Sequence, residues 1–343
     1  MGRKVRQEAS AGLAALVDEA AELGSLAVGR MEAGLDEAGK MYAAALEFGR
    51  ERLLEYSELP HDWRNNEHIL SGYRYITIDR WPVLLRSAFE WHNETINIQS
   101  HFLGFLSLLV LAFYVLPGSP HNLPESHWGD TAVAILFIGA AMKCLLCSAA
   151  WHLLSGCATP HWFRGAACVD YVGISGLIGA SVMSIEYYSW YYHPTIAVSY
   201  MAFSGTLAVL GMYLACKPIF NERSFKGWRI AFFLSLAGSA VIPVVHAAYT
   251  FGALKTAKFL LPVMPSLVAY LTGLTFYAHQ FPECAAPGCF DSLLASHQLW
   301  HASIVAAVWL HWRAITFMAA AANAGTDLSF VAVAVAVAGA VGA

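Results

Sequence analysis

The chain has 343 residues, of which 57% are hydrophobic and only 13% are charged. An average soluble domain carries roughly 45–50% apolar and about 25% charged residues, so this chain lacks the charge to cover a water-exposed surface. Its formal net charge of −4 is too small to indicate binding to nucleic acid. The composition therefore excludes an ordinary soluble fold and indicates an α-helical protein that crosses a membrane several times.

Polar residues concentrate in the first 92 positions, whereas residues 93–343 consist of nearly continuous apolar runs. Residues 7–57 are rich in Ala, Glu and Leu and contain no Pro, a composition that predicts one or two amphipathic helices. We therefore expect residues 1–92 to form a largely helical cytosolic region that is accessible to a soluble protein partner.

Seven apolar stretches follow, each close to the ~20 residues that a membrane-spanning helix needs. They cover residues 98–117, 131–155, 168–187, 195–216, 228–249, 259–280 and 295–317. Within the apolar segment 321–343, the Ala/Val-rich run Leu328–Ala343 is slightly too short to span; we interpret it as a loosely bound tail, with an eighth helix as the alternative. The sequence thus predicts an all-α membrane protein with a seven-transmembrane bundle over residues 93–320.

Lysine and arginine residues are distributed unequally between the two sides of this bundle. With the N-terminus inside, the inner segments hold 16 of them and the outer segments hold three, while Lys143 falls within a span. Cytosolic loops carry the excess of positive charge, so we expect a cytosolic N-terminus and a C-terminus on the outside. Either the plasma membrane or an endomembrane suits this topology.

Three polar clusters interrupt the apolar stretches, and ionisable residues at membrane depth indicate a functional site. They lie at the start of the first stretch, from the end of the second stretch to the start of the third, and at the start of the seventh. Their members are Glu94, Asn97, Ser100 and His101; Ser148, His152, Asp170 and Tyr171; and His297 and His301. In the predicted topology all three clusters lie in the cytosolic half of the bilayer, so we expect them to meet.

The histidine spacing favours a metal ion. His297 and His301 are four residues apart and share one helical face, and His152 supplies a third imidazole. Three protein ligands with an open position are typical of catalytic zinc, whose bound water loses a proton near neutral pH. Asp170 is the candidate partner of that water, and Ser148, one turn before His152, is the candidate to fix the His152 ring.

A packing interpretation stands beside each of these hypotheses, because a single H-x-x-x-H pattern in an apolar helix is a weak indication of metal binding. His246 and His311 show the ordinary case, since they lie mid-helix and are interpreted as packing or hydrogen-bonding residues. For Glu94, Asn97 and His101, helix capping explains the polar side chains as well as a supporting role around the metal does. The joint pattern favours zinc.

These residues resemble the motifs of the progestin and adipoQ receptor family, which includes the adiponectin receptors and the haemolysin III-like proteins. The resemblance covers residues 59–317. The motif E-x-x-N-x-x-[ST]-H is met by Glu94, Asn97, Ser100 and His101; the motif S-x-x-x-H with a following Asp-Tyr-x-Gly is met by Ser148, His152, Asp170, Tyr171 and Gly173; and H-x-x-x-H is met by His297 and His301.

The resemblance implies a seven-helix protein in which His152, His297 and His301 bind Zn²⁺ and Asp170 contacts the zinc-bound water. It also implies ceramidase-like activity, the zinc-dependent release of a fatty acid from an amide lipid, with membrane lipids such as ceramide as partners. A receptor, or a sensor of lipid or sterol homeostasis with a structural zinc, remains the alternative. A retinal protein is disfavoured because the seventh stretch has no lysine, and a zinc transporter because the predicted site lies on one side of the membrane.

Overall fold

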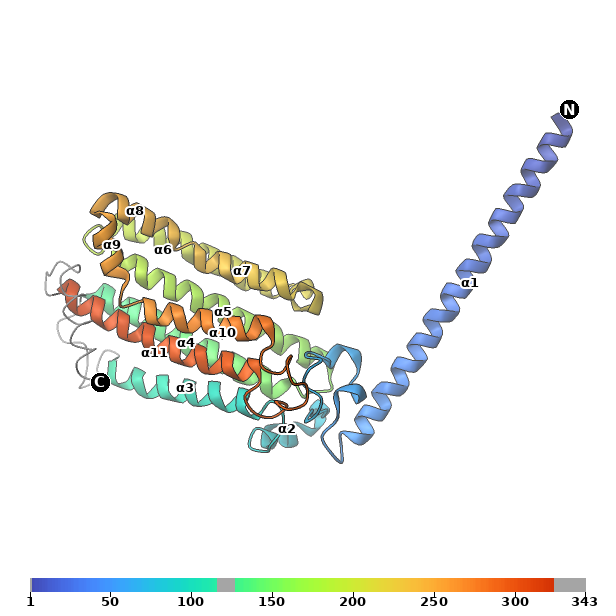
Figure 1. Cartoon of the computed structure of the whole chain (residues 1–343), viewed down its shortest axis with the longest axis horizontal. Helices are drawn as coiled ribbons and strands as arrows, with labels where there is room; N and C mark the ends of the chain where they lie inside the picture. The colour runs from blue at the N-terminus through green and yellow to red at the C-terminus, as the bar shows by residue number, and fades with distance from the viewer. Residues whose placement is uncertain (1, 116–126, 324–343) are drawn as a thin grey trace.

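The computed structural model describes the backbone of residues 2–115 and 127–323 and, with the exception of Arg223, the side-chain surroundings of these residues from residue 25 onward. This part of the chain contains helices and no strand beyond two isolated bridges. Its apolar helices pack side by side (Figure 1). They are α3 Thr95–Val115, α4 Trp128–Leu154, α5 Pro160–Ser189, α6 Pro194–Ala215, α7 Lys226–Gly238, α8 Val241–Phe251, α9 Ala253–Leu260, α10 Met264–His279 and α11 Ser296–Asn323. The predicted all-α fold is confirmed.

The membrane spans follow the predicted apolar stretches with one change in shape. Five single helices and the pair α7–α8 are long and apolar enough to cross a bilayer among the described residues. The remaining stretch, predicted over residues 259–280 as one helix, is bent by 68° between α9 and α10. Pro265 lies in the first turn of α10, where its missing amide hydrogen costs nothing, so a new helix begins after the bend. With this bent pair counted as one span, the bundle has its seven helices.

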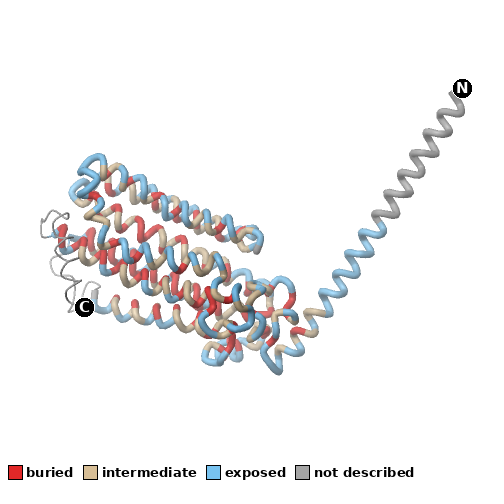
Figure 2. The backbone as a smooth tube through the Cα atoms, in the orientation of Figure 1, coloured by how far each residue is buried: buried red, intermediate tan, exposed pale blue. Residues whose placement is uncertain are grey.

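The hydrophobic core lies where α3, α4, α5 and α11 face one another. Leu108, Phe137, Val308 and Met318 are completely buried in it. The outer faces of the same helices are exposed (Figure 2). Many of their exposed side chains are large and apolar, such as Phe113 at 73% exposure. A surface of this kind is suited to lipid tails rather than water.

Close contact between α4 and α5 near Cys144 depends on Gly173. A Cβ atom at Gly173 would lie 3.0 Å from the Cα atom of Cys144, so a larger residue would push the two helices apart. Small residues at helix contacts let backbones approach closely in membranes. Asp170 lies about one turn before Gly173 on α5, and its position relative to α4 therefore depends on this contact.

The N-terminal region consists of one long helix and an irregular segment. Helix α1, Gly2–Phe48, projects away from the bundle (Figure 1), and its last turns pack through Tyr42 onto Trp63. Residues 54–92, which we call the strap, lie against the bundle end at which α3 and α11 begin and α4 ends; we call this the N-proximal end. The strap contains three 3₁₀ turns and one short helix.

The bounds of these shorter elements are Tyr56–Glu58, His61–Trp63 and Ile78–Arg80 for the 3₁₀ turns and Trp81–Ser87 for helix α2. Two further 3₁₀ turns, Pro218–Asn221 and Arg223–Phe225, connect α6 to α7. The predicted tail or eighth helix over Leu328–Ala343 lies outside the described residues.

Candidate metal centre

Three histidines from two helices converge at the N-proximal end. His152 lies in the last turn of α4, and His297 and His301 lie in the first two turns of α11. One ring nitrogen from each lies within 4.8 Å of the other two. The Nε2 atoms of His152 and His297 are 3.1 Å apart. The residues that the sequence predicted as a ligand set therefore meet around one point.

Hydrogen bonds to the opposite ring nitrogens fix which atoms face that point. The Nδ1 atom of His152 lies 2.7 Å from the Oε2 atom of Glu94, and the Nδ1 atom of His301 lies 3.1 Å from the main-chain oxygen of Asn97. A carboxylate and a carbonyl only accept hydrogen bonds, so their chemistry assigns the ring proton to Nδ1 in both histidines. The Nε2 atoms of both rings are left with lone pairs that can bind a metal ion, as in metal-binding histidines held by a carboxylate.

This arrangement fits a metal ion. Two Nε2 lone pairs 3.1 Å apart repel each other unless a proton or a cation lies between them. A tetrahedral zinc ion about 2.0–2.1 Å from each nitrogen would hold two of them about 3.4 Å apart, which is close to the observed separation. Imidazole ligands also suit zinc better than calcium or magnesium, which prefer oxygen.

Asp170 and Ser148 come together beside the histidines. The Asp170 side chain on α5 is only 8% exposed, and its Oδ1 atom has no hydrogen-bond partner among the described residues. The Ser148 hydroxyl interacts with the Asp170 carboxyl group, which also lies within electrostatic range of the His152 ring. A buried acceptor without a partner costs free energy unless water or a ligand satisfies it. One Asp170 oxygen therefore lacks a hydrogen-bond donor among the described residues.

The first predicted motif supports the centre in two ways. Asn97 donates from Nδ2 to the Oε2 atom of Glu94 over 2.7 Å. The residue that holds the His152 ring is therefore bonded to the residue that holds the His301 ring. The ring of His101 stacks on the ring of His301 with centroids 3.6 Å apart and an interplanar angle of 7°. His101 is outside the three-histidine group, and neither of its ring nitrogens has a hydrogen-bond partner in the described part of the chain.

Two residues at this site received no role from the sequence. Arg74 in the strap is buried and donates from Nη2 to the main-chain oxygen of His152 over 2.8 Å. Burial lowers the pKa of Arg74 to about 10, so its guanidinium stays charged at neutral pH. Glu283 in the loop before α11 is completely buried and accepts a hydrogen bond from the main-chain nitrogen of Ser296 over 2.7 Å. Glu283 and Asp291 are the two acidic residues between the last two apolar stretches, and their presence there was the only sequence signal for Glu283.

The histidines interpreted as packing residues are hydrogen-bonded elsewhere. The Nδ1 atom of His246 lies 2.9 Å from the Tyr200 hydroxyl. His311 lies between two serine hydroxyls, with Nε2 2.9 Å from Ser184 and Nδ1 3.3 Å from Ser266. Their interpretation as hydrogen-bonding residues is confirmed.

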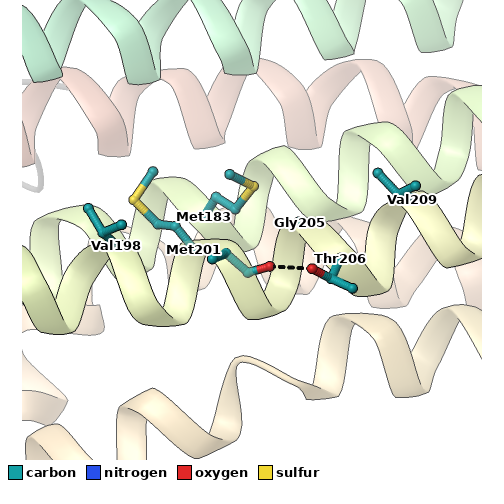
Figure 3. A pocket seen from close by; sticks show the side chains of 7 residues that line it. Met183, Val198, Met201, Gly205, Thr206 and Val209 are labelled. Atoms are coloured by element: carbon teal, nitrogen blue, oxygen red, sulfur yellow. Dashed lines mark hydrogen bonds between the residues drawn. The ribbon is translucent and has the colours of Figure 1, made fainter.

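A separate groove of about 570 Å³ lies between α5 and α6 (Figure 3). Its lining is mostly apolar and includes Met183, Met201 and Val209, beside Gly205. Met183 follows Asp170 by 13 residues on α5, which places the groove about 20 Å further along the bundle at 1.5 Å per residue. The groove is therefore not part of the histidine centre.

The fold and the site together define a class: a multi-pass helical membrane protein with a three-histidine group at one end of its bundle. Residues 89–312 match the family model described as Haemolysin-III related. The chain therefore belongs to this family, and the resemblance to the progestin and adipoQ receptors is confirmed.

Named relatives agree with this membership. The ADIPOR-like receptor IZH3 of Saccharomyces cerevisiae is 34% identical over 252 residues, which cover 71% of this chain and 45% of the relative. A Schizosaccharomyces pombe protein, C30D11.11, described as uncharacterized, is 39% identical over 271 residues, which cover 79% of this chain and 61% of the relative. The heptahelical transmembrane protein ADIPOR1 of rice, Oryza sativa, is 31% identical over 317 residues, which cover 77% of this chain and 83% of the relative. The chain thus spans about half to two thirds of the length of the two yeast proteins.

Proposed function

We propose that this receptor-like membrane protein binds zinc through His152, His297 and His301 and hydrolyses a lipid amide in a ceramidase-like reaction. The observation that carries the proposal is the convergence of three imidazole nitrogens within 4.8 Å, beside a buried carboxyl group with an unpartnered oxygen. A purely structural zinc site has all four positions filled by protein ligands, whereas catalytic sites have three. Three histidines with Asp170 nearby match the catalytic pattern.

The excess of Lys and Arg in the N-terminal region and the connected loops supports a cytosolic N-proximal end. In this orientation the centre lies near the inner face of the membrane. A lipid amide in the inner leaflet would then have its polar group at the depth of the histidines and its acyl chains beside the apolar bundle. The same orientation places α1 in the cytosol.

Each polar residue of the centre has a separate role in the proposed reaction. Zinc, when bound, supplies a Lewis acid for the amide carbonyl and lowers the pKa of a bound water. Glu94 and the main chain of Asn97 hold the ligand rings. Asp170 accepts a proton as the water oxygen adds to the amide carbon, and it returns a proton to the amine as the carbon–nitrogen bond breaks. The Ser148 hydroxyl orients the Asp170 carboxyl group for both transfers.

A second candidate is a non-enzymatic receptor, or a sensor of lipid or sterol homeostasis, in which the metal is structural. The contact between α1 and the strap favours it, because Tyr42 and Trp63 lie with ring centroids 5.7 Å apart and connect the projecting helix to the bundle. A cytosolic partner bound to α1 would then be coupled mechanically to the N-proximal end. The name "ADIPOR-like receptor" of a relative is consistent with this reading.

The test is the metal content of the purified full chain together with ceramide hydrolysis, for wild type, His152→Ala and Asp170→Ala. We expect about one zinc per chain in wild type and Asp170→Ala, loss of zinc in His152→Ala, and loss of hydrolysis in both variants. His279→Ala is the matched control, because His279 is an exposed histidine that bonds only to the preceding turn of its own helix among the described residues. Zinc without turnover of any lipid amide would favour the receptor.

A further inference from the structure

The strap is connected to both helices that carry the candidate ligands. It contacts the end of α4, where His152 lies, directly through the buried Arg74. It reaches the start of α11, where His297 lies, through the buried Glu283 of the preceding loop. The spacing between His152 and His297 is therefore tied to the strap as well as to helix packing.

At α11 the contact runs through Glu283. Its Oε2 atom accepts a hydrogen bond from the main-chain nitrogen of Ser296 over 2.7 Å, and its Oε1 atom accepts from the Ser296 hydroxyl. The first turn of a helix has unpaired N–H groups and a partial positive charge, so a buried carboxylate is favourable there. Asn66 of the strap donates from Nδ2 to the same Oε1 atom over 3.0 Å. His297 is the next residue after Ser296, so this cap orients its helical turn.

The loop that contains Glu283 is attached to the strap a second time. Asp291 accepts hydrogen bonds from the main-chain nitrogen of Leu70 over 2.9 Å and from the Ser71 hydroxyl over 2.6 Å. The main-chain nitrogen of Gly288 also donates to the main-chain oxygen of His68 over 3.0 Å, which makes a third attachment point. Three attachment points restrict rotation as well as translation of the loop. The loop therefore cannot carry the first turn of α11 away from the strap without breaking these hydrogen bonds.

At α4 the contact is Arg74, which is 5% exposed. Its guanidinium donates to the main-chain oxygen of His152 over 2.8 Å and to the Ser87 hydroxyl over 2.6 Å. The last carbonyl groups of a helix lack partners within it and carry partial negative charge, which a buried cation stabilises. A Cβ atom at Gly156 would lie 2.8 Å from the Cβ atom of Arg74, so the close approach of the strap requires glycine there.

We propose that Arg74, and Asn66 acting through Glu283, are positioning residues that set the separation of His152 from His297 and so tune metal affinity. The inference rests on the metal centre of the proposed function, but it does not require the hydrolase activity. Ligand geometry must be held within about 0.5 Å for a site to work, and residues that support the ligands typically change metal affinity by 10–100-fold. The two ligands in question come from different helices, so contacts that bridge both helix ends restrict their distance in addition to helix packing.

The test uses cobalt in place of zinc, because its visible absorption reports ligand geometry. The full chain in detergent is loaded with Co²⁺ as wild type, Arg74→Lys, Glu283→Gln and Asn66→Ala. Asn66→Ala leaves the Glu283 cap on α11 in place and is the mildest of the three, so it stays informative where the others fold poorly. We expect about 10-fold or greater loss of cobalt and zinc affinity and an altered cobalt band in Arg74→Lys and Glu283→Gln, with a smaller change in Asn66→Ala.

Arg64→Lys is the matched control. Arg64 is also an arginine of the strap that donates to main-chain oxygens, those of Leu59 and Ser57, but these lie within the strap itself. We expect its cobalt band and metal affinity to equal those of wild type, even where its melting temperature falls. Any variant that weakens folding without moving the ligands should likewise keep the wild-type cobalt band and metal affinity while its melting temperature falls.

The outcomes separate the two ideas. A normal wild-type cobalt band that Arg74→Lys and Glu283→Gln leave unchanged in shape and affinity overturns the positioning role and leaves the metal centre intact. Absence of cobalt binding by folded wild type overturns the metal centre, and the positioning role with it. Equal loss of affinity in Arg64→Lys and Arg74→Lys also overturns the positioning role, because the effect would then be general to the strap.

Discussion

The Nδ1 atom of His152 lies 2.7 Å from the Oε2 atom of Glu94, which joins the last turn of α4 to the residue just before α3. A carboxylate in this position fixes the ring orientation, keeps the proton on Nδ1 and raises the basicity of Nε2. Glu94 is itself held by the side-chain amide of Asn97. This pair supports the proposed metal at the histidine centre in addition to the convergence of the three imidazole rings.

Replacing Glu94 with Gln should weaken zinc binding by about 10–100-fold, because the amide is a poorer acceptor for the His152 N–H and carries no charge. The measurement is zinc affinity by competition with a chromophoric chelator. Gln99→Asn is the control, since Gln99 also lies near the start of α3 but bonds to the main-chain oxygen of Ala88. Equal affinities of Glu94→Gln and wild type would show that His152 does not depend on this carboxylate as a ligand.

His297→Ala and His301→Ala should each lower the zinc content and the melting temperature, because each removes one of three ligands and metal binding stabilises the folded state. Zinc is measured after dialysis against a chelator. His279→Ala should retain wild-type zinc. Full zinc in both α11 variants would mean that the ion binds elsewhere in the chain.

Asp170→Asn should retain zinc but lose about 10²–10⁴-fold in lipid amide hydrolysis, because an amide cannot accept the proton of the attacking water. Ser148→Ala should have a smaller effect on the rate, since the Asp170 carboxyl group keeps its charge. Both are measured as initial rates at equal zinc occupancy. A normal rate in Asp170→Asn would assign proton transfer to another group.

Stability of the strap should fall as the pH falls from about 6.5 to 4. His92 accepts a hydrogen bond from the main-chain nitrogen of Glu94 at Nδ1, and its Nε2 lies 3.0 Å from the main-chain oxygen of Ser87. Burial lowers the pKa of His92 to about 4 from an ordinary value near 6.5. The unfolded chain therefore binds more protons than the folded one between these values, and folding weakens as the pH decreases.

The measurement for His92 is amide hydrogen exchange of residues 87–94 across this pH range, corrected for intrinsic exchange rates. His92→Gln can still place an acceptor near the Glu94 nitrogen but does not titrate, so its protection should be flatter with pH than that of wild type. An identical pH profile in the two proteins would assign the effect to another group.

Several features of the molecule followed from the sequence. Composition and runs of about 20 apolar residues predicted the seven spans, because the bilayer sets both the length and the polarity of a spanning helix. Polar residues at membrane depth predicted the histidine group, because burying ionisable side chains in a bilayer is energetically unfavourable and such residues are usually functional. The bend between α9 and α10 was missed, because hydropathy averages over a window and does not report helix direction.

The support around the histidines depended on tertiary structure. Arg74 bonds to His152 on α4, which is 78 residues away in the sequence, and Glu283 bonds to Ser296 on α11, which is 13 residues away. No local sequence pattern indicates a hydrogen bond across such separations. Ser148 was expected to fix the His152 ring one turn along the same helix; in the structure its hydroxyl interacts with Asp170, and Glu94 of another segment holds the ring. The sequence by itself thus determined the kind of environment each segment occupies, because hydrophobicity is a local property. Only the packed bundle decided which polar groups meet, because those contacts depend on helix rotation and on the path of the strap.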